Sequence, residues 1–230
     1  YGSYMTLQDV LTQIHSGPSG AKHAHTGDWI ASTLRDRIAS GHLAPGMKLP
    51  EEDLCEALGV SRNTLREAFT ALASERIISR IPNRGVFVAQ PMAEDVREIY
   101  RVRRYVEPAA LRWSTTSNFS ALREAVENAQ LARAAGSATD MGTANQNFHA
   151  TVVSLAGSPR LSAMMAPVLA EMRLVFHAMA FDPEFHAPYI AENAHVVDLL
   201  ERGKRSDAAE LMRTYLDSAE QELLAVMQQA

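Results

Sequence analysis

The sequence predicts a mainly α-helical protein in two parts: three helices and a β-hairpin come first, and an all-helical antiparallel bundle follows. β-type runs occur only at 77–80 and 86–88, and the later segments space their apolar residues as helices do. The charge changes at the same place, because residues 1–90 carry nine basic and nine acidic side chains, whereas residues 91–230 carry 13 and 18. We therefore expect a flexible arm over 1–27, a first domain over 28–90 and a second domain over 91–230.

The composition limits the class of protein. Of the 230 residues, 47% are hydrophobic and 21% are charged, which is typical of a soluble globular protein. No apolar run approaches the roughly 20 residues of a membrane span, so we expect no membrane partner. The single cysteine, Cys55, excludes an internal disulfide framework, and we expect no signal peptide. Both features favour a cytoplasmic location.

Local signals define the elements of the first domain. A first helix runs from about Asp28 to Gly41, and a short second helix stops at Gly59, since glycine commonly follows the last helical residue. Ser61 is a good N-cap for a third helix. The turn Pro82-Asn83-Arg84-Gly85 then joins two β-type runs into a hairpin. Three helices followed by such a hairpin make a winged helix-turn-helix. The first helix is expected to bury one face formed by Trp29, Ile30, Leu34 and Ile38.

The third helix places Arg62 and Arg66 on one face, because residues four apart are neighbours on a helix. The N-terminal residues of a recognition helix contact base edges, and arginine matches guanine O6 and N7. Residues 61–90 hold five arginines and two glutamates, a local charge of +3. These features favour DNA binding over the alternative, in which the arginines only decorate an exposed helix and Arg66 pairs with Glu67 or Glu52.

Four motifs, PG at 45–46, LGVSR at 58–62, LREA at 65–68 and PNRG at 82–85, resemble the winged helix of the GntR family of transcription regulators. The remainder resembles the ligand-sensing FCD domain of the FadR branch of that family, and the resemblance covers about 28–225. One position departs from it, because Glu52 stands where some relatives have a DNA-contacting arginine. The resemblance implies that the DNA contacts come from Ser61, Arg62, Asn63, Thr64, Arg66, Arg84 and Gly85.

The second domain is expected to contain helices over about 93–116, 119–135, 139–156, 160–179, 188–202 and 206–229. In many FCD domains an Asp and three His residues hold a divalent metal beside a small carboxylate. The resemblance maps these four positions onto Asn145, His149, Asn193 and Tyr215. Asn193 is chosen over His195 because it precedes Gly203 by the family's spacing and shares the apolar face of its helix.

Neutral amides and a phenol are poor ligands for Zn²⁺, so we expect that the metal site has been lost. The alternative is a Zn or Ni ion held by His149 with Asn145 and Asn193. Without a metal, the same groups could bind a polar small molecule, or they could form a satisfied buried network. Arg103 also faces inward, where it either pairs with Glu107 or binds an effector carboxylate.

These features predict a transcription regulator, and we expect a repressor, that binds a pseudo-palindromic DNA operator as a homodimer. A small effector, which we expect to be a carboxylate, would control its affinity for DNA. Two alternatives remain: a metal-dependent sensor, and an enzyme with an accessory DNA-binding domain. His177, His195 and His186, the last in a proline-bounded loop, show no H-x-x-x-H spacing and no partnered nucleophile. We therefore do not expect an enzyme.

Overall fold

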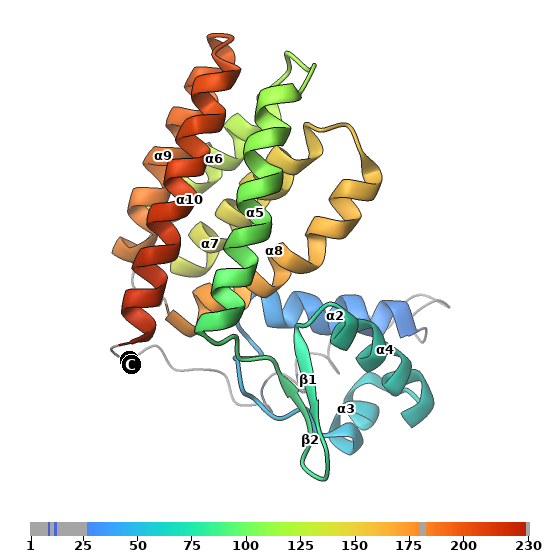
Figure 1. Cartoon of the computed structure of the whole chain (residues 1–230). Helices are drawn as coiled ribbons and strands as arrows, with labels where there is room; N and C mark the ends of the chain where they lie inside the picture. The colour runs from blue at the N-terminus through green and yellow to red at the C-terminus, as the bar shows by residue number, and fades with distance from the viewer. Residues whose placement is uncertain (1–8, 10–11, 13–26, 180–182, 229–230) are drawn as a thin grey trace. The chain divides into compact units, whose positions relative to one another are not determined.

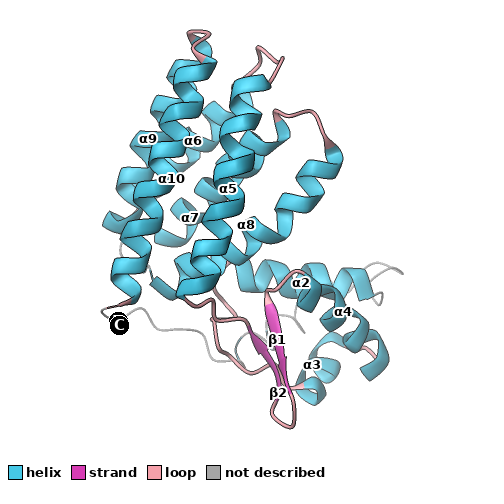
Figure 2. Ribbon diagram, in the orientation of Figure 1, coloured by secondary structure: helices cyan, strands magenta, loops and turns pink. Residues whose placement is uncertain are grey.

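The computed structural model describes residues 27–179 and 183–228, together with Asp9 and Thr12. The chain divides into two compact units, with the boundary between Gln90 and Pro91. The arm predicted over 1–27 lies almost entirely outside the described residues. Figures 1 and 2 show that helices dominate both units and that the first unit carries a β-hairpin.

The first unit is a winged helix-turn-helix, which confirms the prediction. It consists of α2 (Gly27–Ala39), α3 (Glu51–Leu58), α4 (Arg62–Ser74), β1 (Ile78–Ile81) and β2 (Gly85–Val88). Gly59 ends α3 with a φ of 65°, a left-handed conformation that glycine adopts without a steric penalty. Ser61 then caps α4, since the Thr64 N–H donates to Ser61 Oγ at 3.2 Å. A tight turn therefore joins α3 to α4.

The hairpin pairs β1 with β2 in antiparallel register, with Ile78 opposite Val88 and Ile81 opposite Gly85. Asn83 sits in its turn with a φ of 61°, and the Arg84 N–H donates to the Ile81 carbonyl at 3.0 Å. Proline followed by a residue of positive φ is the pattern of a type II turn. The sequence signal at 82–85 therefore closes the hairpin in the expected place.

Buried apolar side chains from all three helices and from the hairpin form the core of the first unit. The predicted buried face of α2 was wrong at Trp29, because Trp29 is 37% exposed and Ala31 is buried instead. The core includes Ile30, Leu34, Ile38, Leu43, Leu54, Leu65, Phe69, Leu72 and Ile77.

Segment 47–49 pairs with β2. The Leu49 N–H donates to the Val86 carbonyl and the Val88 N–H donates to the Met47 carbonyl, both at 2.8 Å.

The second unit is an all-helical bundle. Its elements are α5 (Ala93–Trp113), α6 (Ser120–Ala134), α7 (Ala138–Ser154), α8 (Pro159–Met179), α9 (Pro183–Glu201) and α10 (Arg205–Met227). α7 packs against α5, α6, α8 and α9, and α10 packs along α5 and α9. Because α7 has neighbours on most sides, polar residues on it are buried along with its apolar ones. None of the described helices combines the length and apolar character needed to cross a membrane.

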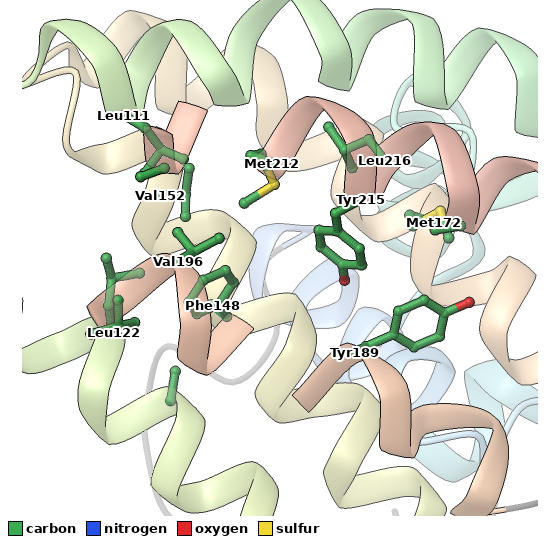
Figure 3. Packing of buried hydrophobic residues seen from close by; sticks show 14 of the residues in the cluster. Leu111, Leu122, Phe148, Val152, Met172, Tyr189, Val196, Met212, Tyr215 and Leu216 are labelled. Carbon is green, nitrogen blue, oxygen red and sulfur yellow. The ribbon is translucent and has the colours of Figure 1, made fainter. Parts of the chain in front are cut away.

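Figure 3 shows how the core of the second unit forms around α7. Phe148 and Val152 of α7 lie among apolar residues of the neighbouring helices. Tyr215 of α10 points into the interior next to Tyr189 of α9, with ring centroids 5.8 Å apart. The bundle therefore encloses polar aromatic groups at its centre. Its core also includes Leu111, Leu122, Met172, Val196, Met212 and Leu216.

Helix α9 begins earlier than predicted. The sequence analysis started this helix at 188 and placed His186 in a loop, but the helix begins at Pro183 and includes His186. Pro188 lies inside α9, where it removes one backbone donor without ending the helix. His186 is buried, with its ring centroid 5.5 Å from that of Phe176. Residues 180–182, part of the predicted preceding loop, lie outside the described residues.

Candidate DNA interface and ligand site

The N-terminus of α4 is exposed and well ordered by its cap. Ser61 Oγ lies 2.7 Å from Thr64 Oγ1 in addition to accepting the Thr64 N–H. Ser61, Arg62 and Asn63 are exposed, and Thr64 is half-buried. The positive end of a helix macrodipole and its free N–H groups favour a phosphate at this position. The predicted anchoring residues are therefore placed on an accessible helix terminus.

Arg62 and Arg66 are both solvent-accessible, with side chains 64% and 60% exposed. Each guanidinium pairs with a carboxylate at the start of α3: Arg62 lies 3.9 Å from Glu52, and Arg66 lies 3.0 Å from Glu51. The sequence analysis was wrong about the partner of Arg66, because it considered Glu67 and Glu52. Exposed ion pairs contribute little to stability, so these arginines can exchange carboxylates for nucleic acid at low cost.

Arg80 belongs to the same surface, although the sequence analysis did not include it among the site residues. Its Nη2 donates to the Arg66 carbonyl at 3.1 Å and to Thr70 Oγ1 at 2.9 Å. Its only sequence signal was its contribution to the local positive charge. The position beside α4 depends on how the hairpin packs, which spacing along the chain does not give.

The turn of the hairpin carries Arg84 and Gly85, both exposed. Gly85 has a φ of 111°, a region that other residues rarely adopt, and the Arg84 guanidinium lies 5.8 Å from the ring centroid of Phe87. This turn presents a cation on a narrow tip of backbone. Such a tip can contact a phosphate or enter a groove beside the one that α4 enters.

A second candidate site lies inside the helical unit. Asn145 and His149 lie one turn apart on α7, Asn193 is on α9, and Tyr215 is on α10; all four are buried. Asn193 Nδ2 donates to Asn145 Oδ1 at 2.8 Å, and His149 Nε2 lies 3.3 Å from the Tyr215 hydroxyl. His195 is exposed, which agrees with the choice of Asn193. The helices thus bring the four positions together, and their role in ligand binding stays a prediction.

Arg103 forms a buried ion pair with Glu107. Its Nε donates to Glu107 Oε1 at 2.7 Å, and the other carboxylate oxygen of Glu107 lies 2.7 Å from His149 Nδ1. Burial alone would raise the pKa of Glu107, but the charge of Arg103 and the hydrogen bonds from His149 and Arg103 lower it to about 2. Of the two predicted roles of Arg103, the pairing with Glu107 is present. Sequence reasoning did not foresee that Glu107 also holds His149.

The same contacts fix the proton on His149. Burial lowers the pKa of the ring below its ordinary value of 6.5, although Glu107 opposes the shift, so the ring is neutral near pH 7. The ionised Glu107 accepts, which places the proton on Nδ1 and leaves Nε2 as an acceptor. Burial also raises the pKa of Tyr215, so its hydroxyl keeps its proton and can donate to Nε2.

The metal implied by the resemblance does not fit this donor set. Among Asn145, His149, Asn193 and Tyr215, only the histidine is a good ligand for Zn or Ni, and its free nitrogen faces the Tyr215 hydroxyl. Among the side chains that the structure describes, no three of His, Cys, Asp or Glu gather in a metal-binding arrangement. The carboxylate of Glu107 contacts Nδ1 of His149, whereas Tyr215 contacts Nε2, so Glu107 orients the ring and is not one of the four positions.

One cavity connects these residues with others that the sequence analysis missed. Arg103, Asn145 and His149 line it together with Gln146 of α7 and Arg173 of α8. Arg173 is buried, yet no motif marked it, because α8 reads as an ordinary apolar helix and only packing shows which side faces the cavity. The site therefore combines neutral hydrogen-bonding groups with two guanidinium groups.

Comparison with known proteins agrees with both units. The model of bacterial regulatory proteins of the gntR family matches residues 26–88, and the FCD domain model matches residues 98–218. The galactonate operon transcriptional repressor of Escherichia coli K12 is 30% identical over 212 residues, which cover 80% of this chain and 90% of the relative. The gluconate operon transcriptional repressor of Bacillus licheniformis is 42% identical over 84 residues, 36% of this chain and 34% of the relative.

Similarity to a solved structure extends over most of the chain. A transcriptional regulator GntR from Rhodococcus sp. RHA1 is 41% identical, with a TM-score of 0.84 over 86% of this chain and 97% of that one. The exposed arginines of the first unit and the buried polar groups of the helical unit agree with these matches. The chain therefore belongs to the gntR family of bacterial regulatory proteins and carries an FCD domain as its second unit.

Proposed function

We propose that this DNA-binding transcriptional regulator is a repressor whose affinity for its operator is set by a small carboxylate bound in the helical unit. The observation that supports this most is the presence, in one chain, of exposed arginines on a capped recognition helix and of a small cavity in the FCD domain that Arg103, Asn145, His149 and Arg173 line together with apolar side chains. Two of the relatives are repressors of galactonate and gluconate operons. A hydroxylated carboxylate of the sugar-acid class is therefore the effector that we propose.

Neutral groups in and next to the cavity support such a ligand. Asn145 lines the cavity and accepts a hydrogen bond from Asn193, whose own Oδ1 is buried without a hydrogen-bond partner among the described residues. A hydroxyl group could satisfy that oxygen, since a buried polar atom gains stability from a partner. Effector binding must favour one arrangement of the regulator over another to change operator affinity, and the size of the change equals that preference.

We also propose that the chain acts by binding alone, without a catalytic step and without a bound Zn or Ni ion. Of the histidines considered for catalysis, His186 packs among aromatic rings and His195 is exposed on α9. His149 is held between Glu107 and Tyr215 and faces no serine or cysteine nucleophile in those contacts. The groups at the four family positions favour hydrogen bonding over metal coordination.

The operator test uses the full chain and a pool of random duplex DNA. We expect repeated selection to enrich an inverted repeat with half-sites no more than about one helical turn, ~34–36 Å, apart. Adding D-galactonate or D-gluconate to the selected duplex should release the protein at fixed ionic strength. Enrichment of no sequence would contradict the DNA-binding proposal. Enrichment followed by indifference to every small carboxylate tried would contradict only the proposed effector class.

We propose that the homodimer forms through α5. Val102, Tyr105 and Trp113 lie within an arc of about 80° on this helix, and their side chains are 37%, 81% and 75% exposed. Large apolar side chains gathered on one exposed face are typical of a protein interface. An inverted-repeat operator requires a two-fold partner, so a second copy of the chain is the occupant that we propose.

Tyr105→Glu should convert the dimer into a monomer, because it buries a charge in the apolar interface. Light scattering coupled to gel filtration should show the mass falling from about twice to once the chain mass of 25.2 kDa. Leu131→Glu, at a 69% exposed apolar residue of α6, is the matched control and should leave the dimer intact. A Tyr105→Glu protein that remains dimeric would place the interface elsewhere.

A further inference from the structure

Arg173 of α8 is a buried arginine held on one side only. Arg173 is only 3% exposed to solvent. Nη2 donates to the Thr139 carbonyl at 2.8 Å and to Thr143 Oγ1 at 3.3 Å, both on α7. Nε is buried and has no hydrogen-bond partner among the described residues. The guanidinium is therefore positioned by α7 while part of its donor capacity is left free.

The charge of Arg173 is also uncompensated, in contrast to that of Arg103. Arg103 has Glu107 at 2.7 Å, whereas Arg173 forms no ion pair with any acidic side chain that the structure describes. Burial lowers the pKa of Arg173 to about 10, and the more distant charge of Asp140 only partly opposes this. A buried charge without a partner destabilises a protein. Without a bound anion, the charge of Arg173 is therefore not expected to stabilise the fold.

Gly142 of α7 makes room for this guanidinium. A Cβ at residue 142 would lie 2.3 Å from Arg173 Nη1 and 2.9 Å from Cζ, closer than real contacts allow. Glycine inside a helix is less favourable than alanine, so a buried helical glycine calls for a packing reason. Here the reason is the close approach of the arginine. Helices α7 and α8 are thus shaped to hold a cation at this point.

Arg173 lines the same cavity as Arg103, Asn145 and His149. Since Arg103 is neutralised by Glu107 and His149 is neutral, the positive charge that remains facing this cavity is that of Arg173. The cavity volume is about 10 Å³, room for about one water molecule. A larger ligand must therefore displace side chains, and the flexible Met172 in the cavity wall can move.

We propose that Arg173 is the residue that binds the carboxylate of the effector, in place of Arg103. A hydroxyl group of the same ligand would then reach the side chain of Asn145, which lines the same cavity. Arg103 keeps a positioning role, because it holds Glu107 and through it the orientation of His149. This inference rests on the proposed effector-controlled function. It names the Arg173 guanidinium as the group that selects an anionic ligand over a neutral one.

The test measures binding to the full chain by calorimetry at constant ionic strength. The probes are three matched pairs: D-galactonate with galactitol, D-gluconate with glucitol, and glycolate with glycolamide. We expect at least one carboxylate to bind and its neutral counterpart to bind at least 10-fold more weakly, as loss of a charge-assisted hydrogen bond implies. Equal binding of both members of every pair, or no binding of any carboxylate, would overturn the inference.

Arg173→Met removes the charge and keeps the length of the side chain. It should weaken carboxylate binding at least 10-fold and leave the melting temperature equal or higher, because it removes an unpaired buried charge. A purely structural arginine would instead lower the melting temperature, and that result with unchanged binding would overturn the inference. Gly142→Ala should weaken binding as well, since its methyl group displaces the guanidinium. Arg160→Met, at an exposed residue of α8, is the matched control.

Operator binding separates this inference from the proposed function. The Arg173→Met protein should still bind the selected duplex but no longer be released by the carboxylate that releases the wild type. If the wild type is released by a carboxylate and the Arg173→Met protein is released equally well, the regulator function stands and the assignment of Arg173 fails. If neither protein binds any selected duplex, the proposed function fails at the DNA step.

Discussion

Replacing Arg66 by alanine is expected to abolish specific operator binding while the first unit remains folded. A bidentate arginine contact to a base is worth about 1–3 kcal/mol of discrimination. The proposed dimer would lose one such contact in each half-site, so the total loss would exceed about 30-fold in affinity. The stability cost should be small, because the ion pair of Arg66 with Glu51 is exposed.

Fluorescence anisotropy with the selected duplex and a scrambled duplex, at one salt concentration, measures this loss. Arg213→Ala is the matched control, since Arg213 of α10 also pairs with exposed carboxylates, those of Glu210 and Asp217. Glu51→Gln provides a second comparison: it frees Arg66 and removes a negative charge, so affinity for both duplexes should rise. Unchanged specific binding by the Arg66→Ala protein would exclude Arg66 from the residues that read the operator.

The sequence was informative about the first unit because its signals are local. The N-cap at Ser61, the glycine that ends α3 and the turn at 82–85 act within a few residues of one another, so spacing alone predicts them. The inward face of α9 was predictable for the same reason, since Asn193 follows a regular apolar pattern. The start of α9 was misplaced, because the segment around His186 was interpreted as a proline-bounded loop rather than as the first turn of the helix.

The contacts of the ligand site depend on packing between helices, which periodicity does not encode. Glu107 and His149 are 42 residues apart, and Arg173 reaches Thr139 across 34 residues. A sequence shows that each residue is polar on an inward face, but not which other helix faces it. Gly142 is an example: the sequence does not explain a glycine at this position of α7, and only the position of the Arg173 guanidinium does.

Replacing Glu107 by glutamine should have the largest effect on stability in the helical unit. It leaves the fully buried Arg103 without its counter-charge, and breaking a buried ion pair costs about 3–5 kcal/mol. For a domain of this size the loss corresponds to a fall in melting temperature of roughly 10 °C. Urea unfolding followed by circular dichroism measures the change. Glu210→Gln, at an exposed pair with Arg213, should change stability by less than about 1 kcal/mol.

The pH dependence of unfolding tests the same cluster. The pKa of Glu107 is about 2 in the folded chain against an ordinary value of 4.5, so its contribution is present above pH 4.5 and is lost as the pH falls toward 2. The pKa of His149 is also lowered by burial, and the unfolded ring takes up a proton below pH 6.5 while the folded ring does not. Both groups therefore make the unfolding free energy rise with pH over the acidic range.

In the Glu107→Gln protein the part of this slope below pH 4.5 should become shallower, whereas the part from His149 should remain. Urea midpoints measured from pH 3 to pH 8 separate the two.

A double variant distinguishes a pair kept for stability from one kept for positioning. Arg103→Met with Glu107→Leu removes both charges and fills the space with apolar atoms, a change that is often neutral or stabilising for buried pairs. We expect it to recover most of the stability that Glu107→Gln loses. Unlike the wild type, it should not be released from operator DNA by the carboxylate, because His149 Nδ1 loses its acceptor and the ring loses its fixed orientation. Recovery of both stability and response would show that the ion pair has no part in arranging the ligand site.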